Sequence, residues 1–334
     1  MQTRRSDRHL TARPIGFAAL VIATFAAGAR DLPAQTPPAP AALLGAAKSW
    51  GYQLQKINPG VIASAPYDVF VIDYSSDGGD EHAFTAEDIA RLKRKPDGSR
   101  RIVLCYLSIG EAESYRYYWR PEWDSAALAP AWLVAANKRY RTNILVRYWS
   151  DEWQAIVFRG ENNYLDRILA AGFDGVYLDR VDVQQEFEAE NPSAREQMVA
   201  FVEAIAVRAR SRNPDFLVVP QNAEELLDDA GYRAAIDGIA KEDLLFGDGR
   251  SKRPNTPERI AAGVRQLRQM TAERKPVFVV EYLDKPEDIV RAKKEIEGYG
   301  FIPHFAKRGL DVMRIGDLPP APPPRAPAEK GGRK

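Results

Sequence analysis

The sequence predicts an α/β protein whose fold is a single-domain (β/α)8 TIM barrel. From Trp50 onward, short apolar runs alternate with polar turns and with segments whose apolar residues recur every three or four positions. The runs are almost continuously apolar, which is typical of strands buried on both faces of a parallel sheet. Eight such units over about 260 residues match the usual size of a barrel.

Each expected strand is five to seven residues long and is followed by a turn. The sixth is the weakest of the set, since "DGIAKE" holds three charged residues. An open, doubly wound sheet is the alternative, but no G-x-G-x-x-G follows the first strand. The expected strands cover residues 69–74, 102–108, 144–149, 175–179, 216–221, 237–242, 277–282 and 301–305.

The intervening helices carry recognisable start signals. Thr85, Ser193 and Thr256 stand where an N-cap is expected, and Pro257 and Pro286 stand at plausible first helical positions. We therefore expect amphipathic helices between the strands, packed against the outside of the sheet.

The two ends of the chain read differently from its middle. Residues 1–29 combine four arginines, a fifteen-residue apolar run and an Ala-Gly-Ala ending, which predicts a secretory signal. A membrane anchor is the alternative, but the run is short for a full span. Residues 30–47 read as a Pro/Ala-rich linker, 48–318 as the barrel and 319–334 as a disordered, basic Pro-rich tail. We expect a secreted or periplasmic protein without a stable membrane anchor after cleavage.

Composition excludes several classes of function. The chain has 47 basic and 46 acidic residues, and its middle is slightly acidic, so nucleic-acid binding is not supported. Cys105 is the only cysteine and lies in the apolar run "IVLCYL", where a buried packing thiol is expected. With only three histidines, a His-based zinc site is poorly supported. We expect a monomer without a metal or another cofactor.

Polar residues gather where the expected strands end. In a barrel, the carboxyl ends of all strands meet at the face that carries the active site. Carboxylates there would form an acidic rim, and the aromatic residues beside them could pack on the apolar face of a sugar ring. This pattern favours a carbohydrate substrate. The polar residues are Asp73, Glu111, Asp179, Asn222, Glu242 and Glu281, and aromatic neighbours are Tyr74, Tyr148, Trp149 and Tyr282.

Six segments, taken in order, resemble glycoside hydrolase family 114, the endo-α-1,4-polygalactosaminidase type. The resemblance covers about residues 50–309, and it implies a (β/α)8 fold with catalytic acids ending the fourth and sixth strands. One departure is Ser150-Asp151, where Asp-Pro is expected before Glu-Trp. The segments are "YLSIGEAE" (106–113), "VRYWSDEW" (146–153), "GFDGVYLDRVD" (172–182), "PQNAEELL" (220–227), "DGIAKEDLLFG" (237–247) and "VVEYL" (279–283).

The resemblance implies roles for individual residues. Asp179 matches the nucleophile and Glu242 the acid/base, and the implied substrate is an α-linked, galactosamine-containing exopolysaccharide. A cationic polymer of this kind would be attracted by the acidic rim. The expected substrate-binding residues are Asp73, Tyr74, Glu111, Tyr148, Trp149, Asp182, Asn222, Glu281 and Tyr282.

Glycoside cleavage needs one ionised and one protonated carboxyl group, which is the hypothesis for Asp179 and Glu242. Arg180 could keep Asp179 ionised, and Lys241 should point away from the site because strand residues alternate faces. Retention of configuration is expected by resemblance. Three alternatives stay open: a polysaccharide-binding barrel without turnover, a barrel that binds Mg²⁺ through Asp179, Glu242 and Glu281, and a glycosidase of another sugar specificity.

Overall fold

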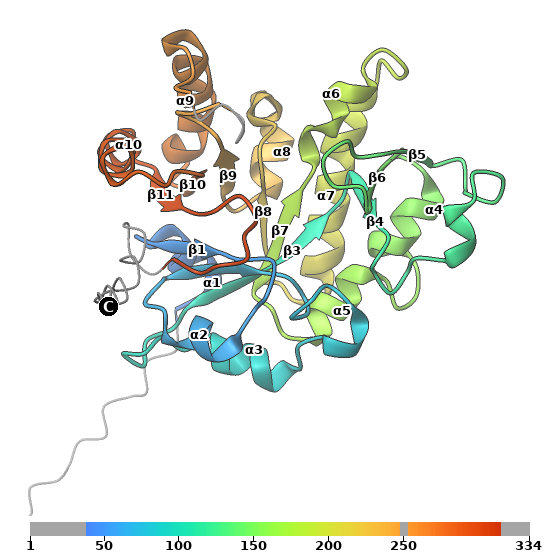
Figure 1. Cartoon of the computed structure of the whole chain (residues 1–334), viewed down its shortest axis with the longest axis horizontal. Coiled ribbons are helices and arrows are strands. Elements are labelled where there is room, and N and C mark those ends of the chain that lie inside the picture. Colours follow the sequence, from blue (N-terminus) through green and yellow to red (C-terminus); the bar gives the residue numbers. More distant parts are fainter. Residues whose placement is uncertain (1–37, 248–252, 315–334) are drawn as a thin grey trace, which may run out of the picture. The chain divides into compact units, whose positions relative to one another are not determined.

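A computed structural model describes residues 38–247 and 253–314 of the chain. The expected secretory signal and the expected tail from residue 319 lie outside the described residues. Helix α1 (Pro40–Gly45) falls within the segment expected as a linker and buries Leu44. Figure 1 shows the path of the chain and the labels used below.

Within the described residues, eight parallel strands are arranged as a barrel, and the predicted fold class is confirmed. Gln221 and Ala240 form a parallel bridge that joins the two groups of strands. β11 contacts β1 (Figure 1), and Trp50 Nε1 donates a 3.0 Å hydrogen bond to the Ile302 carbonyl. One group runs β1 (Trp50–Tyr52), β2 (Val69–Ile72), β3 (Ile102–Ser108), β7 (Gly175–Asp179) and β8 (Leu217–Pro220), and the other β9 (Ile239–Glu242), β10 (Val277–Glu281) and β11 (Ile302–Phe305).

One predicted barrel strand was assigned wrongly. The run 144–149 contributes only β6 (Asn143–Val146), which pairs antiparallel with β4 (Glu111–Glu113) and β5 (Leu133–Ala136). These three strands form a separate sheet, the insertion sheet, which follows β3 and lies beside the barrel in Figure 1. The barrel strand missing from the prediction is β1, which has only three residues and shows no readable periodicity.

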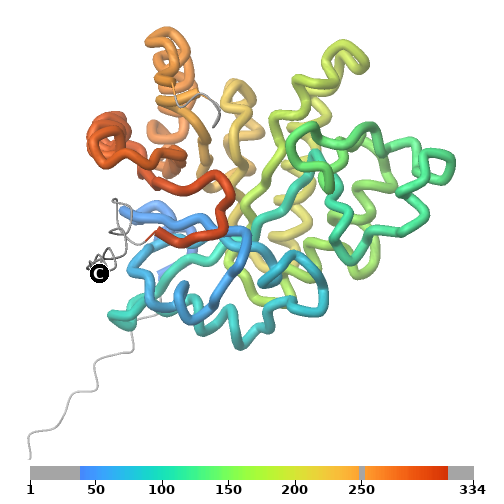
Figure 2. The backbone as a smooth tube through the Cα atoms, viewed as in Figure 1, coloured from blue at the N-terminus to red at the C-terminus, as the bar shows by residue number. Residues whose placement is uncertain are grey.

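Helices follow most barrel strands and surround the barrel, as the tube in Figure 2 shows. Thr85 and Thr256 cap α3 and α9 as predicted, by accepting from backbone N–H groups of the first turn. Ser193 stands at the N-cap of α7 as predicted, but its hydroxyl makes no capping hydrogen bond. The other helices are α2 (Pro59–Ser64), α3 (Ala86–Leu92), α4 (Asp151–Gln154), α5 (Tyr164–Ala170), α6 (Gln184–Phe187), α7 (Ala194–Arg212), α8 (Ala230–Ala235), α9 (Pro257–Ala272) and α10 (Pro286–Gly298).

Shorter helical turns complete the description. They are the 3-10 turns Asp80–His82, Pro121–Asp124, Val181–Val183 and Glu224–Asp228, and a π-helical turn, Ala155–Arg159. No helix within the described ranges is long and apolar enough to cross a membrane.

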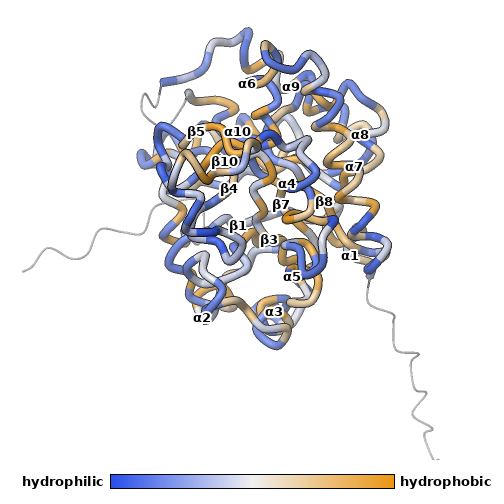
Figure 3. The backbone as a smooth tube through the Cα atoms, turned by 90° about the vertical axis from the view of Figure 1, so that its right-hand side faces the viewer, coloured by the Kyte–Doolittle hydropathy of each residue, from blue (hydrophilic) through white to orange (hydrophobic). Residues whose placement is uncertain are grey.

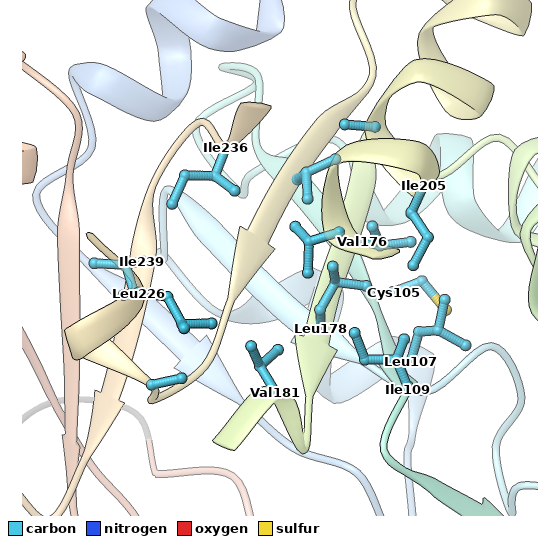
Figure 4. Close-up of a cluster of buried hydrophobic side chains, with 14 of the residues drawn as sticks. Cys105, Leu107, Ile109, Val176, Leu178, Val181, Ile205, Leu226, Ile236 and Ile239 are labelled. Carbon is cyan, nitrogen blue, oxygen red and sulfur yellow. The ribbon is translucent and has the colours of Figure 1, made fainter. Parts of the chain in front are cut away.

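Alternation along the strands divides the core into two layers. Inside the barrel, the Trp50 ring lies 6.3 Å from that of Tyr177 and 5.3 Å from that of Phe278. Outside it, Val176 and Leu178 of β7 pack with Cys105 of β3 beneath the helices (Figure 4). Cys105 is a buried free thiol, as predicted. Figure 3 shows hydrophobic segments in the interior and more hydrophilic ones in the outer loops.

Candidate active site

Asp179 and Glu242 face the barrel interior at the carboxyl ends of β7 and β9. Asp179 shares its strand face with Tyr177, and Glu242 shares its face with Ala240; both of these neighbours belong to the inner core. The two carboxylates line one cleft of about 600 Å³. Lys241 precedes Glu242 on β9, turns outward as predicted and pairs with Glu224 at 2.8 Å.

The Asp179 carboxylate is held by two donors. The Tyr106 hydroxyl donates to Oδ2 at 2.7 Å, and the backbone N–H of Arg180 donates to Oδ1 at 2.7 Å. Tyr106 comes from β3, which is the neighbour of β7 in the sheet. Both hydrogen bonds favour the ionised form of Asp179, which is the form a nucleophile needs.

The Glu242 carboxylate is held from the other side of the cleft. The Tyr282 hydroxyl donates to its Oε1, and the Asn222 side chain accepts a 3.1 Å hydrogen bond from its backbone N–H. The Arg308 guanidinium lies over the Tyr282 ring at 3.8 Å and pairs with Asp243 at 2.6 Å. Tyr282 is thus fixed on one face by a cation and at its hydroxyl by Glu242.

Both carboxyl groups hold protons more tightly than usual. Burial, and after it the neighbouring Glu242 charge, raise the pKa of Asp179 to about 7 against the opposing effect of the Tyr106 hydrogen bond. Burial also raises the pKa of Glu242, while the hydrogen bond from Tyr282 opposes the shift. Because the charge of Glu242 raises the pKa of Asp179, the two carboxyl groups titrate as a coupled pair.

Left-handed backbone conformations occur directly after the strands that carry the site. Arg180 after β7 has φ of 61°, and Asp243 after β9 has φ of 55°. Such conformations are costly for residues with a β-carbon and concentrate at functional sites. The turn at Arg180 also explains Gly110 of the "SIGEAE" segment, since a β-carbon at Gly110 would lie 2.3 Å from the Arg180 carbonyl oxygen.

The acidic rim expected from the sequence is partly neutralised by two arginines. Arg116 makes two 2.7 Å contacts with Asp73 and one of 2.6 Å with Glu113. Arg180 pairs with Glu111 at 2.9 Å and with Asp182 at 3.4 Å. These ion pairs were not predicted from the sequence. Because they compensate part of the negative charge, the rim should attract cations less than expected.

Five of the residues expected to bind substrate line the cleft with Asp179 and Glu242. Tyr282 donates to Glu242, while Asp73, Glu111 and Asp182 are engaged in the ion pairs above. Asn222 anchors the Glu242 backbone. All five face the same opening at the carboxyl ends of the strands.

Four other expected binding residues do not line this cleft. Tyr74 packs edge-on against Tyr164, and Tyr148 is fully buried and donates to the Ala194 carbonyl. Trp149 packs against Phe187.

Glu281 is also fully buried, and it points outward from the barrel. It accepts a 2.6 Å hydrogen bond from the Leu245 backbone N–H, in the loop that follows Glu242. Burial raises its pKa to about 8.

Several cleft residues were not in the expected set. Tyr52 of β1 lies within the inner aromatic cluster, 5.1 Å from the Tyr177 ring, and it was missed because β1 itself was not predicted. Tyr115 and Tyr140 belong to the region of the insertion sheet, and Arg308 belongs to the loop after β11. The sequence gives no signal that places Tyr115, Tyr140 or Arg308 in the cleft. In the described part of the chain, no group of three His, Cys, Asp or Glu side chains is arranged to hold a metal ion.

Comparison with known proteins assigns the family. The sequence model of glycoside-hydrolase family GH114 matches residues 30–316. The chain belongs to family GH114. It is therefore a glycoside hydrolase, and the resemblance seen in its sequence segments is confirmed.

Relatives of this GH114 chain occur in distant organisms. An uncharacterized protein of Deinococcus radiodurans is 36% identical over 282 residues, which covers 83% of this chain and 86% of the relative. The corresponding match to a Thermotoga maritima protein is 33% over 291 residues, with coverage of 83% and 86%. A Methanocaldococcus jannaschii protein is 35% identical over 281 residues, with coverage of 79% and 77%.

Two solved structures share the fold of this GH114 chain. The glycoside hydrolase domain of PelA from Pseudomonas aeruginosa has a TM-score of 0.60 at 19% identity, covering 80% of this chain and 97% of that domain. Ega3 from Aspergillus fumigatus, solved in complex with galactosamine, has a TM-score of 0.58 at 18% identity, with coverage of 85% and 98%.

Proposed function

We propose that this glycoside hydrolase is an endo-acting enzyme that cleaves α-1,4-linked, galactosamine-containing polysaccharide with retention of configuration. The observation that carries the proposal is the convergence of Asp179 and Glu242 in one cleft, each with a raised pKa. Membership of GH114 and the galactosamine bound to the structurally similar Ega3 support the choice of sugar.

The first step uses the charge and the proton of the pair. In the reactive form of the pair, Asp179 is ionised and accepts two hydrogen bonds, while Glu242, whose pKa is raised by burial, carries the proton. An oxygen of Asp179 attacks the anomeric carbon while the glycosidic C–O bond breaks. Glu242 transfers its proton to the departing oxygen, which leaves a sugar esterified to Asp179.

The second step restores both groups. Glu242, now ionised, takes a proton from water, and the water oxygen attacks the anomeric carbon. The ester bond to Asp179 breaks, the sugar is released with its original configuration, and Glu242 again carries a proton. Tyr106 and Tyr282 keep the two carboxylates oriented through both steps.

Stereochemistry and location can each be measured. Proton NMR of freshly released product should show the α-anomer first; the β-anomer first would reject retention.

We further infer export from the cytoplasm, because residues 1–29 read as a secretory signal. Fractionation of expressing cells should yield a protein whose N-terminus lies near residue 30, and a full-length cytoplasmic protein would contradict this.

A sugar-binding barrel without turnover would bind the same polymer but release no product. A barrel that needs a metal would lose its activity in EDTA, whereas the proposed mechanism predicts full activity there. Because Arg116 and Arg180 neutralise rim carboxylates, affinity for a cationic oligomer should fall only gently with added salt.

A further inference from the structure

The far wall of the cleft carries two exposed tyrosines that the proposed chemistry does not use. Tyr115 is 44% exposed and Tyr140 is 45% exposed, and both line the same cleft as the two catalytic carboxylates. Tyr115 is the second residue after β4, and Tyr140 lies in the connection between β5 and β6. The neighbouring backbones are joined, since Ser114 N–H donates to the Thr142 carbonyl at 2.8 Å.

Tyr115 is held in a fixed orientation in spite of its exposure. Its hydroxyl donates to Glu113, and the Arg116 guanidinium lies over its ring at 4.9 Å. The edge of the Tyr115 ring packs against Gly78. A β-carbon at Gly78 would lie 2.7 Å from Cε2 of Tyr115, so only glycine leaves room for the ring. Gly78 has φ of 89°, a conformation that glycine adopts without strain. An exposed ring held by three neighbours differs from a freely rotating surface tyrosine.

The segment that carries Tyr140 is tied to the catalytic strand. Asn137 accepts the Tyr140 N–H at 3.2 Å and donates to Glu111 at 2.8 Å. Glu111 in turn pairs with Arg180, whose backbone N–H holds Asp179. The Tyr140 ring therefore belongs to a wall that is connected to the nucleophile through hydrogen bonds and an ion pair.

We propose that Tyr115 and Tyr140 form a second sugar-binding subsite, which takes a pyranose unit of the polymer remote from the cleaved bond. The proposal rests on the proposed function for the identity of the polymer. The apolar C–H face of a pyranose packs on an aromatic ring, and a preorganised ring loses little entropy on binding. Such remote contacts can supply binding energy to the reacting centre.

The kinetic test compares chain lengths. We would measure kcat/KM of the full chain and of Tyr115→Ala on galactosamine oligomers from the shortest cleaved up to polymer. The loss caused by the substitution should grow with length and reach about tenfold on polymer, equivalent to about 1.4 kcal/mol. An equal loss at every length, or none, would overturn the subsite. The Tyr140→Ala variant should show the same length dependence.

Two variants separate a sugar contact from a structural effect. Tyr115→Phe keeps the ring but loses the hydrogen bond to Glu113. This variant should therefore retain most of the wild-type kcat/KM on polymer. Tyr299, which is half-buried beside α10 and outside the cleft, offers a matched loss of a tyrosine. Tyr299→Ala should show no length dependence; a length-dependent loss there equal to that of Tyr115→Ala would reject the assignment.

A binding measurement separates this proposal from the proposed function. In an Asp179→Asn background, calorimetry with galactosamine and N-acetylgalactosamine polymers should show affinity that falls about tenfold on adding Tyr115→Ala. If the wild type cleaves no such polymer while this dependence holds, the proposed function fails and the subsite stands. If neither polymer binds with an affinity that depends on Tyr115, the subsite fails.

Discussion

The Tyr106 hydroxyl donates a 2.7 Å hydrogen bond to Asp179 between two neighbouring barrel strands. This bond opposes the effect of burial on Asp179, whose pKa is nevertheless raised to about 7. The protein thus buries this carboxylate and supplies a donor that favours its charged form, which is the form that the proposed nucleophile role requires.

Substituting Tyr106 by Phe should weaken the ionisation of Asp179. A hydrogen bond to a charged group contributes about 1.5 to 3 kcal/mol, so the pKa of Asp179 should rise by at least about one unit. The acid limb of the kcat/KM profile should move to higher pH by that amount. If activity falls equally at all pH values, Tyr106 acts on shape and not on the proton affinity of Asp179.

The buried Asp179 should make folding stability depend on pH. Its folded pKa of about 7 lies above the ordinary 3.8, so the folded protein binds more protons than the unfolded chain between these values. The free energy of unfolding should therefore fall as pH rises from about 4 to about 7. Asp179→Asn removes this penalty, and its stability relative to the wild type should increase by at least about 1.4 kcal/mol from pH 4 to pH 8. Urea unfolding at both pH values measures this, and a constant difference would contradict it.

Asp73 should contribute to stability through Arg116. The Arg116 side chain is completely buried, and two of its three carboxylate contacts go to Asp73. Asp73→Ala should cost about 3 to 5 kcal/mol in urea unfolding, because it leaves a buried cation poorly compensated. Asp77→Ala, which removes an exposed carboxylate from the same loop, should cost about 1 kcal/mol or less. If the two substitutions lowered the free energy of unfolding equally, the buried pair of Asp73 and Arg116 would contribute no more to stability than an exposed carboxylate.

Glu281 and Glu242 allow the same chemical change at two different places. Glu281 faces outward beneath a loop, and its pKa is raised to about 8, so it is largely protonated near neutral pH. Glu281→Gln should therefore keep most of the activity at pH 7 and should stabilise the protein above pH 8, where the wild type must ionise a buried acid. Loss of activity as complete as that of Glu242→Gln would show that Glu281 takes part in the chemistry.

Much of the fold could be predicted because apolar runs mark buried strands over several residues. β1 escaped because Trp50–Tyr52 is too short to show a pattern. The run 144–149 was misassigned because its apolar residues fit an insertion sheet as well as a barrel wall. Whether a buried strand pairs parallel or antiparallel depends on partners that are distant in sequence.

The site could be predicted in part for a similar reason. Strand ends located Asp179 and Glu242, but neighbouring residues on a strand face opposite sides. Glu281 and Tyr282 could not both enter the cleft, and the inward Phe278 and Val280 indicate that Tyr282 is the one that does. Arg116 and Arg180, which neutralise part of the rim, come from loops. No local sequence pattern predicts which carboxylate a loop arginine will contact.

The most direct test is to incubate the full chain and its Asp179→Asn and Glu242→Gln variants with defined α-1,4-linked galactosamine oligomers and to follow the products by mass spectrometry. The account predicts internal cleavage by the wild type and a loss of at least about a thousandfold in each variant, equivalent to about 4 kcal/mol. Intact oligomers with the wild type, or turnover near the wild-type rate in either variant, would contradict it.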